Sequence, residues 1–140
     1  MTASFAARAA VLAALLAAGG AATAADGAAL AATLRDLIGT PVCSVDAECR
    51  TLPYGAKACG GPQAWVAWST RVSDEAALRA AGEKFAAWRR EDVRASGMVS
   101  DCALVVDPGA VCAPAPAASA DGVRTCVLRS TKTGRGRLAQ

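Results

Sequence analysis

The fold is decided by the stretch Ser73–Gly97, which reads S-D-E-A-A-L-R-A-A-G-E-K-F-A-A-W-R-R-E-D-V-R-A-S-G. It holds no proline, and its apolar residues recur at helical spacing in one stripe. The stripe consists of Leu78, Ala81, Phe85 and Trp88. Ser73 is a favourable N-cap and Gly97 a favourable end, so the stretch predicts a helix over residues 74–95.

Six cysteines flank this helix, three on each side: Cys43, Cys49, Cys59, Cys102, Cys112 and Cys126. An even number in a small chain predicts three disulfides. Zinc sites use close cysteine pairs, usually with histidine, and this chain has neither. If all six pair within the chain, one or three bonds must join the two halves. The spacing does not choose among the pairings.

The first residues have the form of a secretory signal peptide. Arg8 precedes an apolar run of about ten residues, half the length of a membrane span. Ala22-Thr23-Ala24 then fits the small-x-small rule, which predicts cleavage after Ala24. We therefore expect a signal peptide over 1–24, no membrane span in the mature form, and a periplasmic or secreted protein.

Composition limits the classes of partner and of catalytic mechanism that this protein could have. Without Arg8, fourteen Lys and Arg residues stand against twelve Asp and Glu, a net charge of +2 that favours no nucleic-acid partner. Twelve arginines against three lysines, with abundant alanine, indicate a GC-rich bacterial genome. The chain has no histidine, which excludes a Ser-His-Asp triad.

The remaining segments predict a single α+β domain over 25–130, with a basic, disordered tail over 131–140. Asp26 is the predicted N-cap of a short helix, 27–38, which is expected to dock by one apolar stripe alone and to bury little otherwise; the stripe consists of Leu30, Leu34, Leu37 and Ile38. Strands near 48–52, 64–69, 103–106 and 123–128 are expected to form one small antiparallel sheet that packs on the long helix. The predicted core consists of Leu78, Phe85, Trp88, Trp65, Val66, Leu104, Val106 and Val127.

Asp46 and Glu48 lie in a turn between two cysteines and could bind calcium. A calcium site needs more oxygen ligands than these two side chains supply. We therefore favour a solvated turn in which Asp46 accepts hydrogen bonds from nearby backbone N–H groups. No metal or cofactor is predicted.

The glycine-rich loop around Lys57 is the most distinctive segment. A lysine beside a disulfide could act as the bait of a protease inhibitor, whereas the glycines could simply form turns next to a structural bond. Tyr54 and Trp68 could bind a ligand by stacking, although aromatic residues more often fill the core.

The carboxylates form no recognisable catalytic pair. Glu91 and Asp92 are helix neighbours that point apart, and Asp101 is isolated. We therefore predict that the protein is not an enzyme, although a hydrolase that uses carboxylates is an alternative.

The order of motifs resembles that of small exported bacterial cysteine-containing proteins with a C-G-G-P motif, whose function is uncharacterised. The motifs are C-x5-C, the segment Gly55–Pro62 (G-A-K-A-C-G-G-P), W-x-x-W-S, S-D-C, D-P-G-x-x-C and a last cysteine. In that pattern a tyrosine often follows C-G-G-P, and here Trp65 or Trp68 takes its place. The resemblance implies an exported disulfide domain and supplies no catalytic residue.

Together these observations predict a binding or structural module of the cell envelope or the medium, with a protein or envelope component as partner. The alternative is an inhibitor of a secreted hydrolase, in which Lys57 is the bait.

Overall fold

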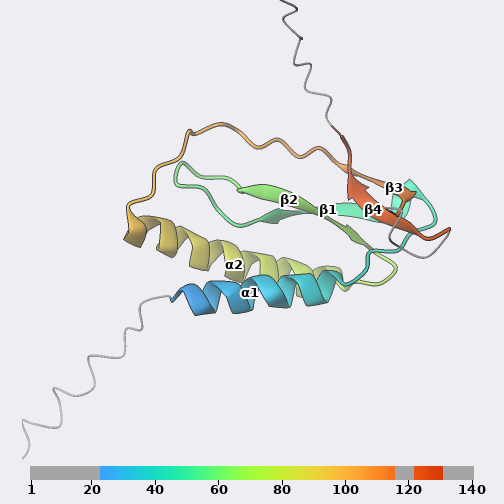
Figure 1. Cartoon of the computed structure of the whole chain (residues 1–140), viewed down its shortest axis with the longest axis horizontal. Coiled ribbons are helices and arrows are strands. Elements are labelled where there is room, and N and C mark those ends of the chain that lie inside the picture. The colour runs from blue at the N-terminus through green and yellow to red at the C-terminus, as the bar shows by residue number, and fades with distance from the viewer. Residues whose placement is uncertain (1–22, 116–121, 131–140) are drawn as a thin grey trace, which may run out of the picture.

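The computed structural model describes residues 23–115 and 122–130. Two helices, one short 3-10 turn and four strands follow one another along this part of the chain (Figure 1). They are α1 (Ala24–Ile38), η1 (Asp46–Glu48), β1 (Cys49–Tyr54), β2 (Ala64–Ser69), α2 (Glu75–Ser96), β3 (Ala110–Pro114) and β4 (Arg124–Leu128). The predicted tail, and all of the predicted signal peptide except its last two residues, lie outside the described residues.

The long helix is confirmed to within one residue at each end. Its N-cap is Asp74 rather than the predicted Ser73, because the Asp74 carboxylate accepts the Ala77 N–H at 2.6 Å. A carboxylate at this position also interacts favourably with the helix dipole. Gly97 ends the helix in the left-handed conformation, with φ 65°, as its sequence position indicates.

The first helix begins earlier than predicted, and Asp26 is not its N-cap. Thr23 caps α1, and Asp26 is the third helical residue, which accepts the Thr23 N–H at 2.8 Å in a capping box. These bonds from Thr23 hold the pKa of Asp26 below its ordinary value. Cleavage after Ala24 stays a prediction, and a cut there would remove this cap.

The first helix docks by its apolar stripe as expected, since Leu30, Leu37 and Ile38 pack against the main core cluster, but it buries more than expected. Leu34 is 1% exposed and lies in the main core cluster. Gly27 is also buried, and the Trp88 ring packs directly against it, so α1 and α2 lie side by side (Figure 1).

The strands form two separate hairpins instead of one sheet. β1 pairs antiparallel with β2, with Leu52 opposite Val66, and β3 pairs antiparallel with β4, with Cys112 opposite Cys126. Both helices lie on one side of the β1–β2 hairpin, while β3 and β4 lie toward its other side (Figure 1).

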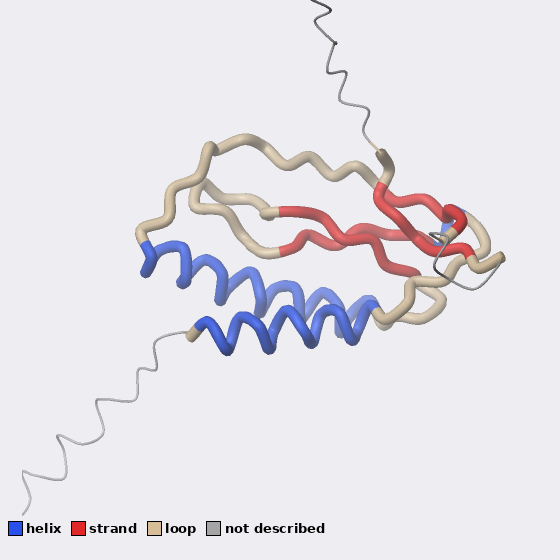
Figure 2. The backbone as a smooth tube through the Cα atoms, viewed as in Figure 1, coloured by secondary structure: helices blue, strands red, loops and turns tan. Residues whose placement is uncertain are grey.

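The predicted strand at 103–106 is absent from both sheets. The chain from α2 to β3 is a long loop that runs beside the β1–β2 hairpin (Figure 2). Leu104 and Val106 are 82% and 70% exposed, so their placement in the core was wrong. The loop contacts the hairpin through side-chain hydrogen bonds, such as that from Trp65 Nε1 to the Val105 carbonyl oxygen at 3.0 Å, and leaves its apolar side chains in solvent.

The main core lies between the helices and the β1–β2 hairpin. Its buried members are Leu34, Leu52, Trp68, Leu78 and Phe85, and partly buried Val66 and Trp88 pack against them. The predicted Leu78 and Phe85 are therefore confirmed.

The three expected disulfides are present, and all three join the two halves of the chain. The pairs are Cys43–Cys112, Cys49–Cys126 and Cys59–Cys102. The first ties the segment before η1 to β3, the second ties the start of β1 to β4, and the third ties the loop between β1 and β2 to the segment after α2. The described residues thus form an α+β fold with three disulfides.

Candidate binding groove beside the glycine loop

The loop Gly55–Gln63 connects β1 to β2 and is closed by its own backbone. Lys57 N–H donates to the Gly61 carbonyl oxygen at 3.0 Å, and Gly60 N–H donates to the Lys57 carbonyl oxygen at 3.0 Å. Gly60 and Gly61 have φ values of 93° and 74°, which residues with a side chain rarely adopt. The two glycines therefore allow the tight turn that brings Lys57 back against the body of the protein.

Lys57 holds the segment that follows α2. Its Nζ lies 2.9 Å from Asp101 Oδ1 and donates to the Ala103 carbonyl oxygen at 2.6 Å. The hydrogen bond from Lys57, followed by that from the Ala103 N–H, holds the pKa of Asp101 below its ordinary value. The Lys57 side chain is only 15% exposed, so it does not project from the loop as a bait residue does.

A groove of about 290 Å³ lies between this loop and one flank of α2. Leu52, Gly82 and Ala86 give it an apolar surface, and charged side chains from α2 line it as well. The charged side chains that α2 contributes to the groove are Arg79, Glu83 and Arg90.

The charges along the groove are unequally compensated. Arg79 Nη2 lies 2.7 Å from Glu75 Oε1, and Lys57 is paired with Asp101. Glu83 is exposed and forms no ion pair within the described part of the chain, and the same holds for Arg90. Its guanidinium is therefore available to an acidic group of a ligand that enters the groove.

A second cavity, of about 320 Å³, lies on the other side of Lys57. Arg89 lines it and is held by Gln63 Oε1 at 3.1 Å and by an ion pair with Asp92. Residues 98–101 form the wall away from the helix.

Of the two aromatic residues predicted as ligand contacts, Trp68 lies in the main core and Tyr54 is partly buried against it. Trp68 is 2% exposed and cannot stack on a ligand at the surface, so that prediction is wrong. Tyr54 packs on Phe85 with ring centroids 4.7 Å apart. The burial pattern of β2 places Trp68 against the helices, whereas Trp65 lies on the other face and is partly exposed.

Asp46 and Glu48 use their carboxylates to fix backbone. Glu48 accepts the Ser44 N–H at 2.6 Å, which is the main reason that its pKa is lowered. Asp46 accepts the Cys112 N–H at 2.9 Å, a group distant in sequence rather than the nearby one expected. The two carboxylates thus serve different parts of the fold and do not converge.

The carboxylates considered for catalysis are all ion-paired. Glu91 pairs with Arg94, Asp92 with Arg89, and Asp101 with Lys57. Each is therefore held by a cation rather than placed beside a second carboxylate.

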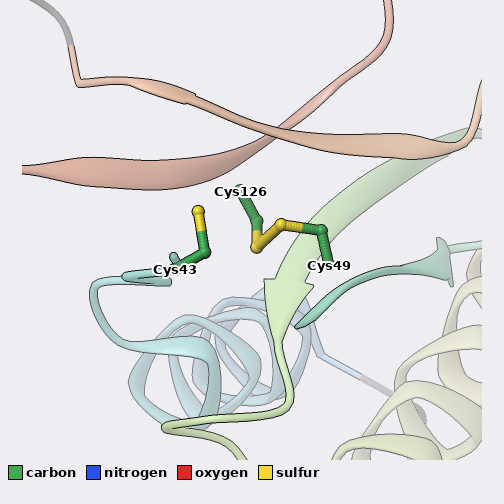
Figure 3. Close-up of side chains that lie close together, drawn as sticks. All are labelled: Cys43, Cys49 and Cys126. Atoms are coloured by element: carbon green, nitrogen blue, oxygen red, sulfur yellow. A yellow bond between two sulfur atoms is a disulfide. The ribbon is translucent and has the colours of Figure 1, made fainter. Parts of the chain in front are cut away.

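Three cysteine sulfurs form the closest cluster of metal-ligand atoms among the described residues. The Sγ atoms of Cys43, Cys49 and Cys126 all lie within 4.8 Å of one another, and Figure 3 shows the Cys43 sulfur beside the Cys49–Cys126 disulfide. Cys43 is itself bonded to Cys112, so each sulfur is oxidised and none is a thiolate ligand.

Sequence reasoning found Lys57 but missed the α2 side of the groove. Arg79, Glu83, Ala86 and Arg90 follow one another at spacings of four, three and four residues, which places them on one helix face. That spacing was a readable signal, but only the folded structure places this face opposite the glycine loop.

Comparison with known proteins does not add a family. No known protein family matches the chain, and searches of curated proteins and of solved structures give no match. Neither described helix combines the length and apolar character needed to cross a membrane.

Proposed function

We propose that this protein is an exported binding module and that the groove between the glycine loop and α2 is its binding site. The observation that carries the proposal is a groove whose walls are fixed on a disulfide-bonded domain. A wall that is ordered before the ligand arrives reduces the entropy lost on binding.

The lining indicates the chemistry of the ligand. Leu52, Ala86 and Gly82 offer apolar contact, and Arg90 offers a cation without an internal partner. A ligand with an apolar body and a carboxylate or phosphate group satisfies both features.

Export is supported by the predicted signal peptide and by three disulfides, which persist in oxidising compartments. The resemblance to exported proteins with a C-G-G-P motif is consistent with the same location. We therefore place the ligand among the proteins and polymers of the bacterial envelope or the surrounding medium.

Calorimetric titration with a capped Ala-Glu-Leu-Glu peptide tests this proposal, with its Gln analogue as the neutral probe. We expect saturable binding of the acidic peptide, weakened about fivefold in Arg90→Gln because an exposed charge-assisted bond contributes roughly 1 kcal/mol. Arg35→Gln, which changes a cation on α1, is the matched control and should bind as the wild type does. Equal binding of both peptides, or equal loss in both variants, would contradict the proposal.

The inhibitor alternative receives less support. Lys57 would have to release Asp101 and the Ala103 carbonyl oxygen before it could enter the pocket of a protease. We expect no inhibition of a trypsin-like protease by the wild type, and inhibition that is lost in Lys57→Ala would favour the alternative.

A further inference from the structure

The three disulfides differ in their access to solvent. The four cysteines of Cys43–Cys112 and Cys49–Cys126 are between 4% and 7% exposed. Cys59 and Cys102 are both exposed. A thiolate in solution must reach a sulfur atom to attack it, so the third disulfide is the one open to exchange.

The exposed disulfide also holds a segment whose hydrogen bonds to the rest of the domain all involve a side chain. Residues 98–108, here called the strap, form no backbone–backbone hydrogen bond with any other described residue. Side-chain hydrogen bonds attach the strap to the body at five residues: Met98, Asp101, Ala103, Val105 and Asp107. Apart from the chain itself, Cys59–Cys102 is the one covalent bond that joins the strap to the rest of the domain.

Backbone geometry sets Cys102 apart as well. It is the one described residue other than glycine with a positive φ, 55°. Residues with a side chain adopt this conformation at a cost, which the surrounding bonds must offset. Release of the disulfide lets Cys102 relax.

We propose that Cys59–Cys102 is a site of thiol–disulfide exchange with a dithiol protein in the compartment to which this protein is exported. Reduction of this disulfide frees the strap. One thiolate of the dithiol attacks a sulfur of the pair, which forms a mixed disulfide and expels the other cysteine as a thiolate. The second thiol of the dithiol then resolves the mixed disulfide. Two electrons pass to Cys59 and Cys102, which end as thiols after protonation, and the dithiol becomes a disulfide.

Opening of the strap changes the second cavity. Met98, Val99, Ser100 and Asp101 line that cavity from the strap side, while Lys57 and Arg89 line it from the body. A freed strap removes the first wall and exposes the second, whereas the two buried disulfides keep the rest of the domain folded. The strap therefore acts as a redox-controlled cover of this cavity.

Partial reduction of the full chain tests the proposal. The oxidised protein is incubated with rising amounts of a reduced thioredoxin-type protein, trapped with N-ethylmaleimide, digested and mapped by mass spectrometry. We expect Cys59 and Cys102 to be labelled at least about tenfold faster than the other four cysteines, with helical circular dichroism unchanged. Simultaneous labelling of all six cysteines, earlier labelling of a buried pair, or no labelling at all would overturn the proposal.

Nuclear magnetic resonance of the partially reduced protein reports the strap itself. Trp65 Nε1–H donates to Val105, so its indole signal should shift on reduction, while those of the buried Trp68 and the helix-packed Trp88 stay in place. Unchanged Trp65 and strap signals in the reduced protein would contradict the release.

Two double variants distinguish the role of this disulfide from that of the buried disulfides. Cys59→Ser/Cys102→Ser should fold with native helix content and should resist further labelling at the same dithiol concentration. Cys43→Ser/Cys112→Ser is the matched control, and it should lose stability more strongly because it removes a buried bond. Failure of the first variant to fold would show that this disulfide belongs to the frame, and the proposal would fall.

Discussion

A methyl group added at Gly27 and the same group added at Gly82 should change stability in opposite directions. Both glycines are buried within helices, Gly27 in α1 and Gly82 in α2. Alanine in place of glycine favours a helix by roughly 0.5–1 kcal/mol, and this gain is common to both sites. The difference must therefore come from what each methyl group meets.

At Gly27 the new carbon would lie 2.1 Å from Trp88 Cη2 and 2.2 Å from Trp88 Cζ2, well inside van der Waals contact. The indole ring cannot swing away freely because it packs against Phe85, with ring centroids 5.8 Å apart. Overpacking of this kind typically costs about 1–3 kcal/mol, which exceeds the helix gain. We expect a net loss of about 1–2 kcal/mol for Gly27→Ala.

At Gly82 the new carbon would lie 3.5 Å from Leu52 Cδ2, an ordinary contact distance. No overpacking opposes the higher helix propensity of alanine at this site, so Gly82→Ala should be more stable than the wild type by roughly 0.5–1 kcal/mol.

Thermal unfolding followed by circular dichroism, with disulfides intact, measures both changes. For a domain of about 100 residues, 1 kcal/mol corresponds to about 4–8 °C. Gly27→Ala should therefore melt at least about 4 °C below the wild type, and Gly82→Ala a few degrees above it. A Gly27→Ala variant as stable as the wild type would show that α1 does not pack on Trp88 and would refute the reasoning.

Three further outcomes follow from the same contacts. Leu34→Ala should cost about 2–5 kcal/mol, measured by urea unfolding, because Leu34 is in the main core cluster, and a loss below about 1 kcal/mol would contradict a docked α1. Hydrogen bonds in the folded protein lower the pKa values of Glu48 and Asp101, so their contribution to stability is present above the ordinary carboxyl pKa and is lost as the pH falls through the lowered values. A melting temperature that rises on acidification below about pH 4 would contradict these bonds. Reduction of all three disulfides should unfold the domain at moderate temperature, because they close loops of 69, 77 and 43 residues and each contributes on the order of 4 kcal/mol in the chain-entropy model. A chelator should have no such effect. A reduced protein that melts within a few degrees of the oxidised one would show that the disulfides do not stabilise the fold.

Local signals in the sequence were enough to predict the long helix. An apolar stripe, an acidic first turn and Gly97 all act within a few residues of one another, so nothing distant had to be known. The count of cysteines likewise predicted bonds between the halves, while the choice of partners depends on the fold and was open.

Features that depend on long-range contacts were not readable. The apolar residues Leu104 and Val106 match a strand pattern, but Cys102 is bonded to Cys59 and the segment is attached by side chains, so they face solvent. The apolar stripe of α1 was readable, but the contact between Gly27 and Trp88 joins residues that are far apart in the sequence and has no local signal.

The candidate site was predicted only on its loop side. The residues G-A-K-A-C-G-G-P identified Lys57 as unusual, but its ion pair with Asp101 joins residues 44 positions apart and has no local signal. The three-residue spacing of Trp65 and Trp68 places them on opposite faces of a strand but does not show which one faces inward, so Trp68 was open both as a ligand contact and as a core residue.

The most direct test of the central claim is a map of backbone amide shifts as the oxidised protein is titrated with the capped acidic peptide. We predict saturable shifts concentrated in residues 52–62 and 79–90, the two walls of the groove. Shifts centred elsewhere, such as on α1 or on the exposed side of the strap, or shifts that do not saturate, would contradict it.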